Sequence, residues 1–579
     1  MIRSLSETPI RMWSTYWVWL GLLAIAGCSS DTQIPTISAT QNVNQYDVVI
    51  VNGRIVDGTG NGWFYGDIGI KDQRIVEMGP RGTLSTATAT ATETIDAAGH
   101  VVAPGFIDIQ SHSRYDLLYG DSRVISKVTQ GVTTEIMGEG SSSAPINPNR
   151  EAGEDEEFFE AFSGEKGFDA WLRAMDNRGT SVNHGSFLGA STVRTYAMGS
   201  SMGVAPPVAV DTMKAVVQRA MEDGAFGIAS ALIYPPGNFA DTDELIEIAS
   251  AMKPYGGVYI THMRSEADQF LEAIDEAIEI GVGADVPLEI YHLKAGGQRN
   301  WHKASQAIAK IDEARALGVD VQANMYPYTA GGTGLTACFP PWASADGKLF
   351  DNLADQEVRG RIRDEIQNQT EEWENMCMLA TPQGVLLLGL ERSENQKYAG
   401  RYLDDIAAEY GKDWMDTAMD LVLSEEQRIG TIYFMMSEDN VRLQIQQPWI
   451  KFGTDAGGVN PAVVENLVHP RAYGTYPRIL GKYVRDEGVI SLEEAVRKMS
   501  SAVATRLSIT DRGLLAEGFY ADVVIFDPAT VIDRATYEEP HQLSVGIRDV
   551  LVNGVAVVRD GSHTGEKPGM IVRGPGYIN

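Results

Sequence analysis

Cysteine and basic residues are both scarce in this chain of 579 residues. Three cysteines are too few for a disulfide-based scaffold. Lysine and arginine number 47 against 78 aspartates and glutamates, which gives a formal net charge of −31. A protein this acidic repels phosphate backbones, so nucleic acid is excluded as the expected partner. The hydrophobic fraction of 44% is that of a globular protein and rules out global disorder or a fibrous architecture.

Long hydrophobic runs are also missing, and the one apolar run near the N-terminus spans only residues 12–27. A membrane-spanning helix needs roughly 20 such residues. Arg3 and Arg11 precede the run and small residues end it, which is the pattern of a secretory signal. Ile25-Ala26-Gly27-Cys28 resembles the bacterial lipobox, whose cysteine is acylated and becomes the mature N-terminus. The alternative is an uncleaved anchor with an incidental cysteine.

The segment after Cys28 reinforces this prediction. Residues 29–45 are rich in Ser, Thr, Asn and Gln and indicate a flexible tether after a signal peptide at 1–28. We therefore expect an enzyme anchored by lipid to a membrane of the bacterial cell envelope, at its periplasmic or outer-membrane face. Cys338 and Cys377 could pair in such an oxidising compartment, but the sequence cannot show that they lie close enough.

The two ends of the remaining chain carry similar strand patterns. Residues 47–58 (DVVIVNGRIVDG) and 549–561 (DVLVNGVAVVRDG) are both β-rich runs broken by Asn-Gly, a strong hairpin signal. They predict one small β-sandwich domain assembled from residues 46–104 and 506–575, with the middle of the chain inserted between them. Two unrelated edge hairpins are the alternative.

The middle of the chain, residues 105–505, alternates short β-branched runs with longer helical patterns such as those at 241–252 and 268–280. This alternation predicts an α/β fold with parallel strands, and eight candidate strand ends match a (β/α)₈ barrel. These ends lie near His112, Glu139, Gly189, Ser230, His262, His292, Tyr326 and Asp455. A ninth candidate strand is TIYFMM (431–436), and the stretch of about 343–430 predicts an inserted helical lid.

Five of these strand ends carry reactive side chains: His112, Glu139, His262, His292 and Asp455. In a parallel barrel the ends of the strands converge on the face where active sites form. Any one histidine alone would be explained by packing, but five such groups on five strands predict a catalytic centre.

Several motifs in order along the chain resemble those of the amidohydrolase superfamily. They are PGFIDIQSH (104–112), GVTTEIMGEG (131–140), THMR (261–264), YHLK (291–294), YPY (326–328) and GTDAGG (453–458). Within that superfamily, AFGIASALIYPPG (225–237), MMSEDNV (435–441) and HPRAYGTYPRIL (469–480) are similar to the D-aminoacylase branch, the N-acyl-D-amino-acid deacylases. The resemblance implies a metal-dependent hydrolase barrel joined to a small β domain built from both termini.

The resemblance also implies a metal site and a base. His262 and His292 are the expected zinc ligands, since imidazole nitrogen suits zinc and a catalytic site keeps one position open for water. Asp455 is the expected general base, which later returns the proton to the leaving amine. Lys294, Tyr326 and Arg471 match positions that hold the substrate, and a guanidinium suits a carboxylate. Lys294 could equally be a salt-bridged surface residue.

Two departures from the family pattern affect the metal site. Gln110 stands where the branch has the first histidine of His-x-His, and Glu139-Gly140-Ser141 stands where it has Asn-Cys-Gly. The metal-bridging cysteine is therefore missing, and Glu139 is the nearest ionisable residue that could substitute for it. We expect one zinc ion on Glu139, His262 and His292, with His112 nearby and a second divalent metal as the alternative. The alternative is that Glu139 only hydrogen-bonds a loop. A histidine expected after the third strand is also absent, in Gly189-Ala190-Ser191.

The predicted function is metal-dependent hydrolysis of a linear amide in N-acyl-D-amino acids or related N-acyl-amino acids. Two alternatives stay open. One is a cyclic amide hydrolase of the dihydroorotase or hydantoinase kind, although the fourth-strand run AFGIASAL has no lysine to bridge two metals. The other is a catalytically weakened, surface-anchored binding lipoprotein, which Gln110 and the missing cysteine suggest. The sequence indicates no protein partner.

Overall fold

The computed structural model describes residues 44–85, 89–149, 156–164, 166–199, 201–368 and 373–578. The predicted signal peptide and residues 29–43 of the predicted tether lie outside the described residues. Residues 44 and 45, which were expected in the tether, instead begin the first strand. None of the described helices is both long and apolar enough to cross a membrane.

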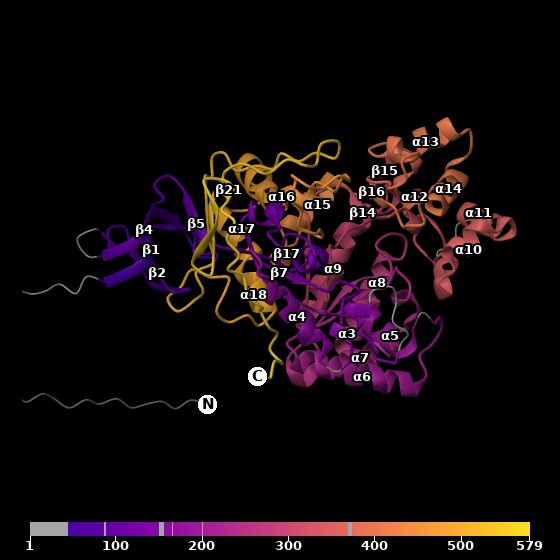
Figure 1. Cartoon of the computed structure of the whole chain (residues 1–579), viewed down its shortest axis with the longest axis horizontal. Helices are drawn as coiled ribbons and strands as arrows, with labels where there is room; N and C mark the ends of the chain where they lie inside the picture. Colours follow the sequence, from indigo (N-terminus) through magenta and orange to yellow (C-terminus); the bar gives the residue numbers. More distant parts are fainter. Residues whose placement is uncertain are drawn as a thin grey trace, which may run out of the picture. The chain divides into compact units, whose positions relative to one another are not determined.

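Eight parallel strands form the centre of the fold (Figure 1). They are β6 (Phe106–Asp108), β7 (Val132–Met137), β8 (Asn183–Ser186) with β9 (Leu188–Gly189), β10 (Gly227–Ala231), β11 (Val258–His262), β12 (Leu288–Ile290), β13 (Val321–Met325) and β17 (Ile450–Phe452). Only Phe187 separates β8, which pairs with β7, from β9, which pairs with β10, so the two form one strand. The ring closes where Ser111 bridges Ala456 and Asp455 N donates to Gln110 O at 2.8 Å. The predicted barrel is thereby confirmed.

Amphipathic helices alternate with these strands along the chain. The longer ones are α4 (Gly167–Arg178), α5 (Ala190–Met198), α6 (Pro207–Glu222), α7 (Thr242–Ser250), α8 (Phe270–Ala284), α9 (Lys303–Ala316), α15 (Glu438–Ile445), α16 (Arg471–Arg478) and α17 (Leu492–Met499). Shorter helices are α1 (Arg114–Leu118), α2 (Ile125–Val128), α3 (Glu156–Phe162) and α18 (Ser501–Arg506). In α8 the buried side chains recur at helical spacing, as Phe270, Ile274, Ala277 and Ile280, so one stripe packs into the core. Asp241 caps α7 by accepting a hydrogen bond from Glu244 N at 2.8 Å.

Strands from both ends of the chain join in one nine-stranded sheet. The N-terminal strands are β1 (Asn44–Ile55), β2 (Phe64–Lys71), β3 (Arg74–Pro80), β4 (Ala89–Asp96) and β5 (Val101–Pro104). The C-terminal strands are β18 (Val523–Phe526), β19 (Ile547–Val552), β20 (Val555–Arg559) and β21 (Ser562–His563). The two groups meet where β5 pairs antiparallel with β18.

The last residues of the chain leave this sheet. Ile571 forms a parallel bridge to His184 of β8, and Val572 N donates to His184 O at 2.8 Å. The prediction that residues up to 575 belong to the β domain is therefore wrong for this tail, which adds to the barrel instead.

An insertion between β13 and β17 has its own sheet and its own core. β14 (Gly331–Gly334), β15 (Val385–Leu387) and β16 (Gly430–Tyr433) pair antiparallel. The α-helices in the described part of the insertion are α10 (Leu349–Ala354), α11 (Gln356–Asn368), α12 (Met376–Ala380), α13 (Leu403–Tyr410) and α14 (Trp414–Glu425). The insertion thus begins before residue 343, and the ninth candidate strand, 431–436, belongs to it as β16 rather than to the barrel.

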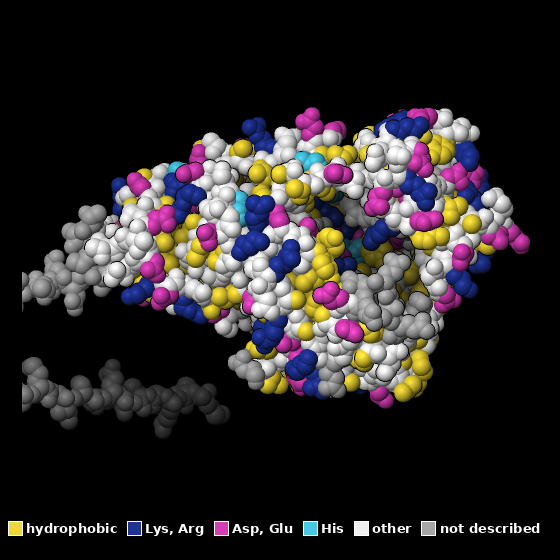
Figure 2. Space-filling model, in the orientation of Figure 1, with side chains coloured by type: hydrophobic (Ala, Val, Ile, Leu, Met, Phe, Trp, Pro, Cys, Tyr) yellow, Lys and Arg dark blue, Asp and Glu magenta, His cyan; other side chains and the backbone are white. Residues whose placement is uncertain are grey.

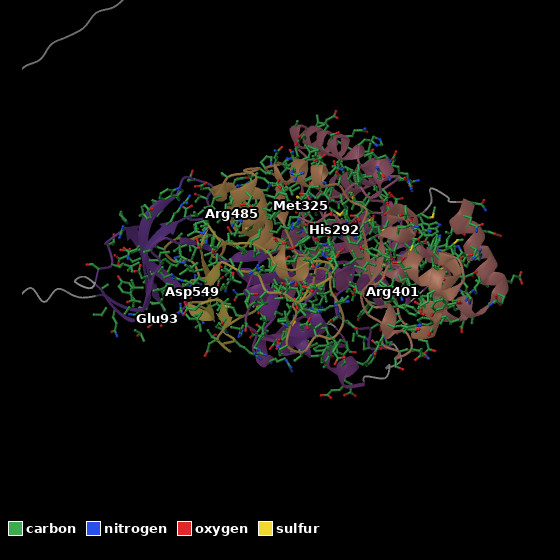
Figure 3. All side chains as sticks on the ribbon, turned by 90° about the horizontal axis from the view of Figure 1, so that it is seen from above. Glu93, His292, Met325, Arg401, Arg485 and Asp549 are labelled. Atoms are coloured by element: carbon green, nitrogen blue, oxygen red, sulfur yellow. A yellow bond between two sulfur atoms is a disulfide. The ribbon has the colours of Figure 1, made fainter. Side chains whose placement is uncertain are left out.

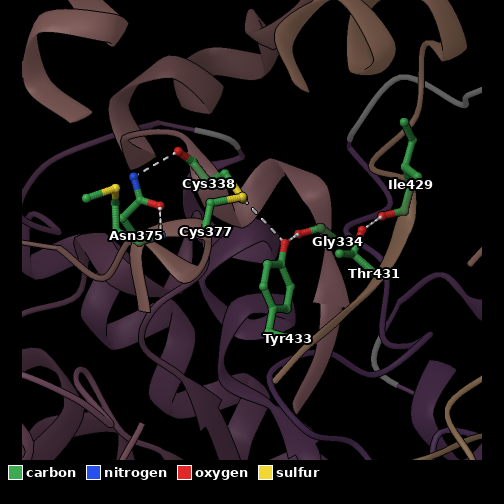
Figure 4. The surroundings of a disulfide bond; sticks show 8 residues. Gly334, Cys338, Asn375, Cys377, Ile429, Thr431 and Tyr433 are labelled. Carbon is green, nitrogen blue, oxygen red and sulfur yellow. Dashed lines mark hydrogen bonds between the residues drawn. A yellow bond between two sulfur atoms is a disulfide. The ribbon is translucent and has the colours of Figure 1, made fainter. Parts of the chain in front are cut away.

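A disulfide fastens the insertion to itself (Figure 4). Cys338 and Cys377 are bonded, with their Cα atoms 5.1 Å apart. Beside the bond, the hydroxyl of Tyr433 donates to Gly334 O at 2.9 Å. The pairing that the sequence left open is therefore present, and it links the end of β14 to α12.

A fully buried lysine joins β6 and β7 to the loop after β17, at the closure of the barrel. Lys127 Nζ lies 2.7 Å from Asp108 Oδ2 on β6 and 3.2 Å from Glu135 Oε1 on β7. It also donates to Ala456 O, just beyond β17, at 2.7 Å. Asp108 in turn accepts a hydrogen bond from Thr454 N at 2.9 Å. This network holds the loop that carries Asp455 against the first strand.

Replacing this lysine should destabilise the protein strongly. In Lys127→Met, two carboxylates stay buried without their cation, which costs about 3–5 kcal/mol for a broken buried pair. The matched control is Lys397→Met, because Lys397 forms an exposed pair with Glu409 whose loss costs about 0–1 kcal/mol. Denaturant unfolding followed by circular dichroism measures both, and equal midpoints for the two variants would show that the network is not structurally important.

Candidate functional site

The described strand ends surround a cavity of about 610 Å³ at the carboxyl side of the barrel. Figure 2 shows a hollow in this face in which a histidine is visible, with basic side chains beside it. Figure 3 labels His292 and Met325, which lie at the ends of the neighbouring strands β12 and β13. All of the residues that the sequence assigned to the site line this cavity: His112, Glu139, His262, His292, Lys294, Tyr326, Asp455 and Arg471.

Glu139 is the centre of the site. Its Oε1 lies 3.2 Å from His262 Nδ1 and 3.1 Å from His292 Nε2. Ligand atoms around a tetrahedral zinc, with bonds of about 2.0–2.1 Å, are roughly 3.3 Å apart. The three side chains are buried or nearly so and can supply three zinc ligands, which leaves one position open. The expected donor set therefore fits zinc.

Local backbone geometry places these ligands. Glu139 sits between Gly138 and Gly140, which have φ of +109° and +63°. A Cβ on Gly138 would come within 2.3 Å of Phe187 O, so only glycine allows this turn directly after β7. His292 and Asp455 themselves have φ of +33° and +50°. Such conformations are costly for side chains other than glycine and occur most often at functional sites.

The two residues that depart from the family pattern, Gln110 and Glu139, contact each other. Its Nε2 donates to Glu139 Oε2 at 2.6 Å, and the residue is 1% exposed. The amide therefore orients the carboxylate next to the position of the missing cysteine. At position 110 the family has a metal-binding histidine, whereas here the side chain is used to hold Glu139. Glu139 contacts both histidines, so it does more than hydrogen-bond a loop.

Asp455 lies close to Glu139, between two cationic partners. Its Oδ1 is 2.9 Å from His112 Nε2, and its Oδ2 is 2.6 Å from Arg471 Nη1. Burial raises the pKa of Asp455, but the Arg471 charge and the His112 hydrogen bond more than offset it and lower that pKa below its usual value. Asp455 is therefore ionised and can accept a proton at neutral pH. His112 Nε2 also lies 3.4 Å from Glu139 Oε2, so these three residues form a second group of donor atoms.

Sequence reasoning missed a buried carboxylate behind the histidines. Glu266 Oε1 lies 2.9 Å from His292 Nδ1 and 2.6 Å from Lys294 Nζ. A carboxylate on the far nitrogen of a metal-binding histidine fixes the orientation of its ring. Its position four residues after His262 was the available signal. Lys294 is therefore salt-bridged, as one alternative expected, but it is buried rather than on the surface.

The insertion contributes to this arrangement. Glu374 accepts hydrogen bonds from Ser265 Oγ at 2.6 Å and from Glu266 N. Burial and the nearby Glu266 charge raise the pKa of Glu374 to about 7. The insertion therefore holds the loop that carries Glu266.

Two of the three predicted substrate residues, Tyr326 and Arg471, lie against each other. The Arg471 guanidinium lies 4.6 Å from the centre of the Tyr326 ring, and the Tyr326 hydroxyl contacts Met436 Sδ at 3.7 Å. Arg471 Nε is buried and has no hydrogen-bond acceptor among the described residues. An unused donor of a buried guanidinium suits an anionic ligand.

Two histidines, a carboxylate and an ionised aspartate at the mouth of a parallel barrel define a metal-dependent hydrolase of the amidohydrolase type. The family model described as "Amidohydrolase family" matches residues 383–558. D-aminoacylase of Alcaligenes xylosoxydans xylosoxydans is 32% identical over 537 residues, covering 91% of this chain and 97% of that protein. N-acyl-D-glutamate deacylase of the same organism is 32% identical over 535 residues, covering 91% and 96%.

Two solved structures of such deacylases are also similar to this chain. A D-aminoacylase studied for the functional role of its binuclear metal centre has 33% identity and a TM-score of 0.75, covering 91% of this chain and 100% of that one. N-acyl-D-glutamate deacylase from Bordetella bronchiseptica, complexed with zinc and a phosphonate inhibitor, has 31% identity and a TM-score of 0.75, covering 92% and 100%. The chain belongs to the D-aminoacylase family within the amidohydrolase superfamily. It is a hydrolase acting on carbon–nitrogen bonds other than peptide bonds, as its motifs predicted.

Proposed function

We propose that this enzyme hydrolyses the linear amide of N-acyl-D-amino acids, using one zinc ion held by Glu139, His262 and His292. The observation that carries the proposal is the contact of one carboxylate oxygen with both histidines, close to an ionised aspartate. Relatives that match nearly the whole chain are named for N-acyl-D-amino-acid deacylation, and one was solved with zinc and a mimic of the tetrahedral intermediate.

The metal and the side chains have separate roles in the proposed reaction. When bound, zinc would lower the pKa of a water molecule and polarise the acyl carbonyl. Asp455 accepts the proton of the attacking water and returns it to the leaving amine, which is general acid–base catalysis by one carboxylate. Arg471 keeps Asp455 ionised, and His112 fixes its orientation.

The same contacts indicate which side chains bind the substrate. Arg471, with an unused buried donor, and the Tyr326 hydroxyl suit the carboxylate of the amino acid. Lys294 is neutralised by Glu266, so its main role is to hold the carboxylate that orients His292. This assigns to Lys294 a positioning role beside the substrate-binding role that its motif implies.

The open alternatives are less well supported. Dihydropyrimidinase of Brevibacillus agri NCHU1002 is 16% identical with a TM-score of 0.54, a likeness that concerns the fold alone. A catalytically weakened binding protein would have no need of an ionised aspartate held by two partners in a metal-binding pocket.

Replacing the base should remove catalysis and spare the metal. In Asp455→Asn, we expect kcat/KM for N-acetyl-D-amino acids to fall roughly 10²- to 10⁴-fold, the range for a lost acid–base group. Zinc content, measured by metal analysis, should stay near one ion per chain. Asp439→Asn is the control, because that carboxylate is 94% exposed on α15. A variant at position 455 with near-normal kcat/KM, or a wild-type enzyme that opens dihydropyrimidines and spares N-acyl-D-amino acids, would overturn the proposal.

The same site supports one metal rather than two. The solved D-aminoacylase is described by one-metal activation and second-metal attenuation. In this chain the second donor group offers only one imidazole, that of His112, because Gln110 is engaged with Glu139. A neutral amide is a poor zinc ligand, so a second ion has little to bind.

Excess zinc should therefore leave the wild-type enzyme active. In Gln110→His, a second imidazole faces the same space, and we expect two zinc ions per chain and activity that falls as zinc is added. Isothermal titration and initial rates across a zinc series measure both. Gln130→His is a control on a buried glutamine outside the site, which bonds Ser126 O and Ala472 O. Inhibition of the wild type by zinc would show that Gln110 does not weaken the second site.

We further propose that the enzyme is anchored by lipid on Cys28 in the bacterial cell envelope. The N-terminal signal pattern and the lipobox-like Ile25-Ala26-Gly27-Cys28 support it. The disulfide between Cys338 and Cys377 also supports it, because such bonds persist in oxidising compartments and are rare in the cytosol.

Metabolic labelling tests the anchor. We expect the full chain to incorporate radioactive palmitate and to sediment with membranes, whereas Cys28→Ser should do neither. Ser29→Ala, next to the acylated position, should behave as the wild type. Labelling that persists in Cys28→Ser would disprove the assignment.

A further inference from the structure

Four lysine and arginine side chains line the cavity, and two of them form no ion pair with a carboxylate of the described residues. Lys294 is paired with Glu266, and Arg471 is paired with Asp455. Arg114 and Arg428 also line the cavity, and neither forms an ion pair with any described residue. In a chain with 78 carboxylates and 47 basic groups, two unpaired arginines at one cavity need an explanation.

Arg114 begins α1, two residues after His112. Its Nη1 donates to Ser141 O at 2.6 Å and to Ser141 Oγ at 2.9 Å, so the loop after Glu139 holds the guanidinium in place. Burial lowers the pKa of Arg114, and the nearby Arg428 charge lowers it further. Both guanidinium groups line the same cavity, where Arg114 is partly buried and Arg428 is exposed.

Arg428 comes from the insertion, two residues before β16. Its Nη2 donates to Thr333 Oγ1 of β14 at 2.7 Å, and Thr333 Oγ1 also accepts from the Tyr234 hydroxyl at 2.8 Å. Each arginine is thus oriented by neutral oxygens, and neither has a carboxylate among the described residues to balance its charge. Two cations that line one cavity form a site that an anion stabilises.

We propose that Arg114 and Arg428 form an anionic subsite for a second carboxylate of the substrate, separate from the α-carboxylate. The inference rests on the proposed deacylase function and extends it to N-acyl-D-amino acids that carry two negative charges. The second carboxylate can belong to the amino-acid side chain or to the acyl group, since both extend from the scissile amide. A guanidinium binds either one by the same charge-assisted hydrogen bonds.

Matched acid and amide substrates test the subsite. N-acetyl-D-glutamate is compared with N-acetyl-D-glutamine for the side chain, and N-succinyl-D-leucine with N-succinamoyl-D-leucine for the acyl group. In at least one pair, we expect the wild type to favour the acid in kcat/KM by roughly 10- to 100-fold, the value of a charge-assisted pair. Arg428→Met and Arg114→Met should each reduce that ratio about tenfold. Rates with N-acetyl-D-leucine should stay within a few-fold of wild type.

Two controls separate the possible failures. Arg401→Met changes an exposed insertion arginine that pairs with Glu409, and it should leave every ratio unchanged. Arg428→Lys, which keeps the charge, should retain part of the preference. Acid-to-amide ratios near one in the wild type, or ratios that neither methionine variant changes, would overturn the subsite while N-acetyl-D-leucine hydrolysis still supports the deacylase.

Binding tests the subsite without turnover. Calorimetry with Asp455→Asn protein and the same two substrate pairs should give tighter binding of the acid in the favoured pair, and Arg428→Met in that background should remove the difference. If no N-acyl-D-amino acid is hydrolysed by the wild type, the proposed function fails, and this binding experiment still decides the subsite.

Discussion

The contact of Glu139 with two histidines is the interaction on which the site depends. One carboxylate brings together the ends of β7, β11 and β12, and Gln110 ties it to the end of β6. Three buried donors that converge without a bound cation are costly unless a metal or protons compensate their charge. The geometry of the barrel is therefore coupled to metal binding, and the glycines around Glu139 exist to let the chain turn there.

The contacts that close the barrel also hold the residues of this site in position. Lys127 bonds the first two strands and the loop after β17, so the strand that carries Asp455 is fixed against the strand that carries Gln110 and His112. Asp455 must be both ionised and correctly placed, and Arg471 supplies the charge that keeps it ionised. Stability and catalysis thus share one network of buried ion pairs on this side of the barrel.

The insertion shapes what the site accepts. Its disulfide and its own hydrophobic cluster make it a rigid unit, from which Glu374 reaches the loop after β11 and Arg428 reaches the cavity. A lid built in this way can vary substrate preference without disturbing the metal ligands, because those ligands all come from the barrel strands.

The sequence by itself determined the barrel, the terminal sheet and the strand ends that carry His112, Glu139, His262, His292 and Asp455. Hydrophobic alternation and motif order are local properties, so they can be recognised along the chain. The tertiary structure alone decided which partners meet. Gln110 orients Glu139, and Glu266 joins His292 to Lys294, through contacts between residues far apart in the sequence. Arg114 and Arg428 line one cavity, and neither pairs with a carboxylate in the described part of the chain. It also decided the pairing of Cys338 with Cys377 and the return of the C-terminal tail to β8. The physical reason is that the distance between two side chains depends on how strands far apart in the sequence are placed around the ring. No local pattern encodes those distances.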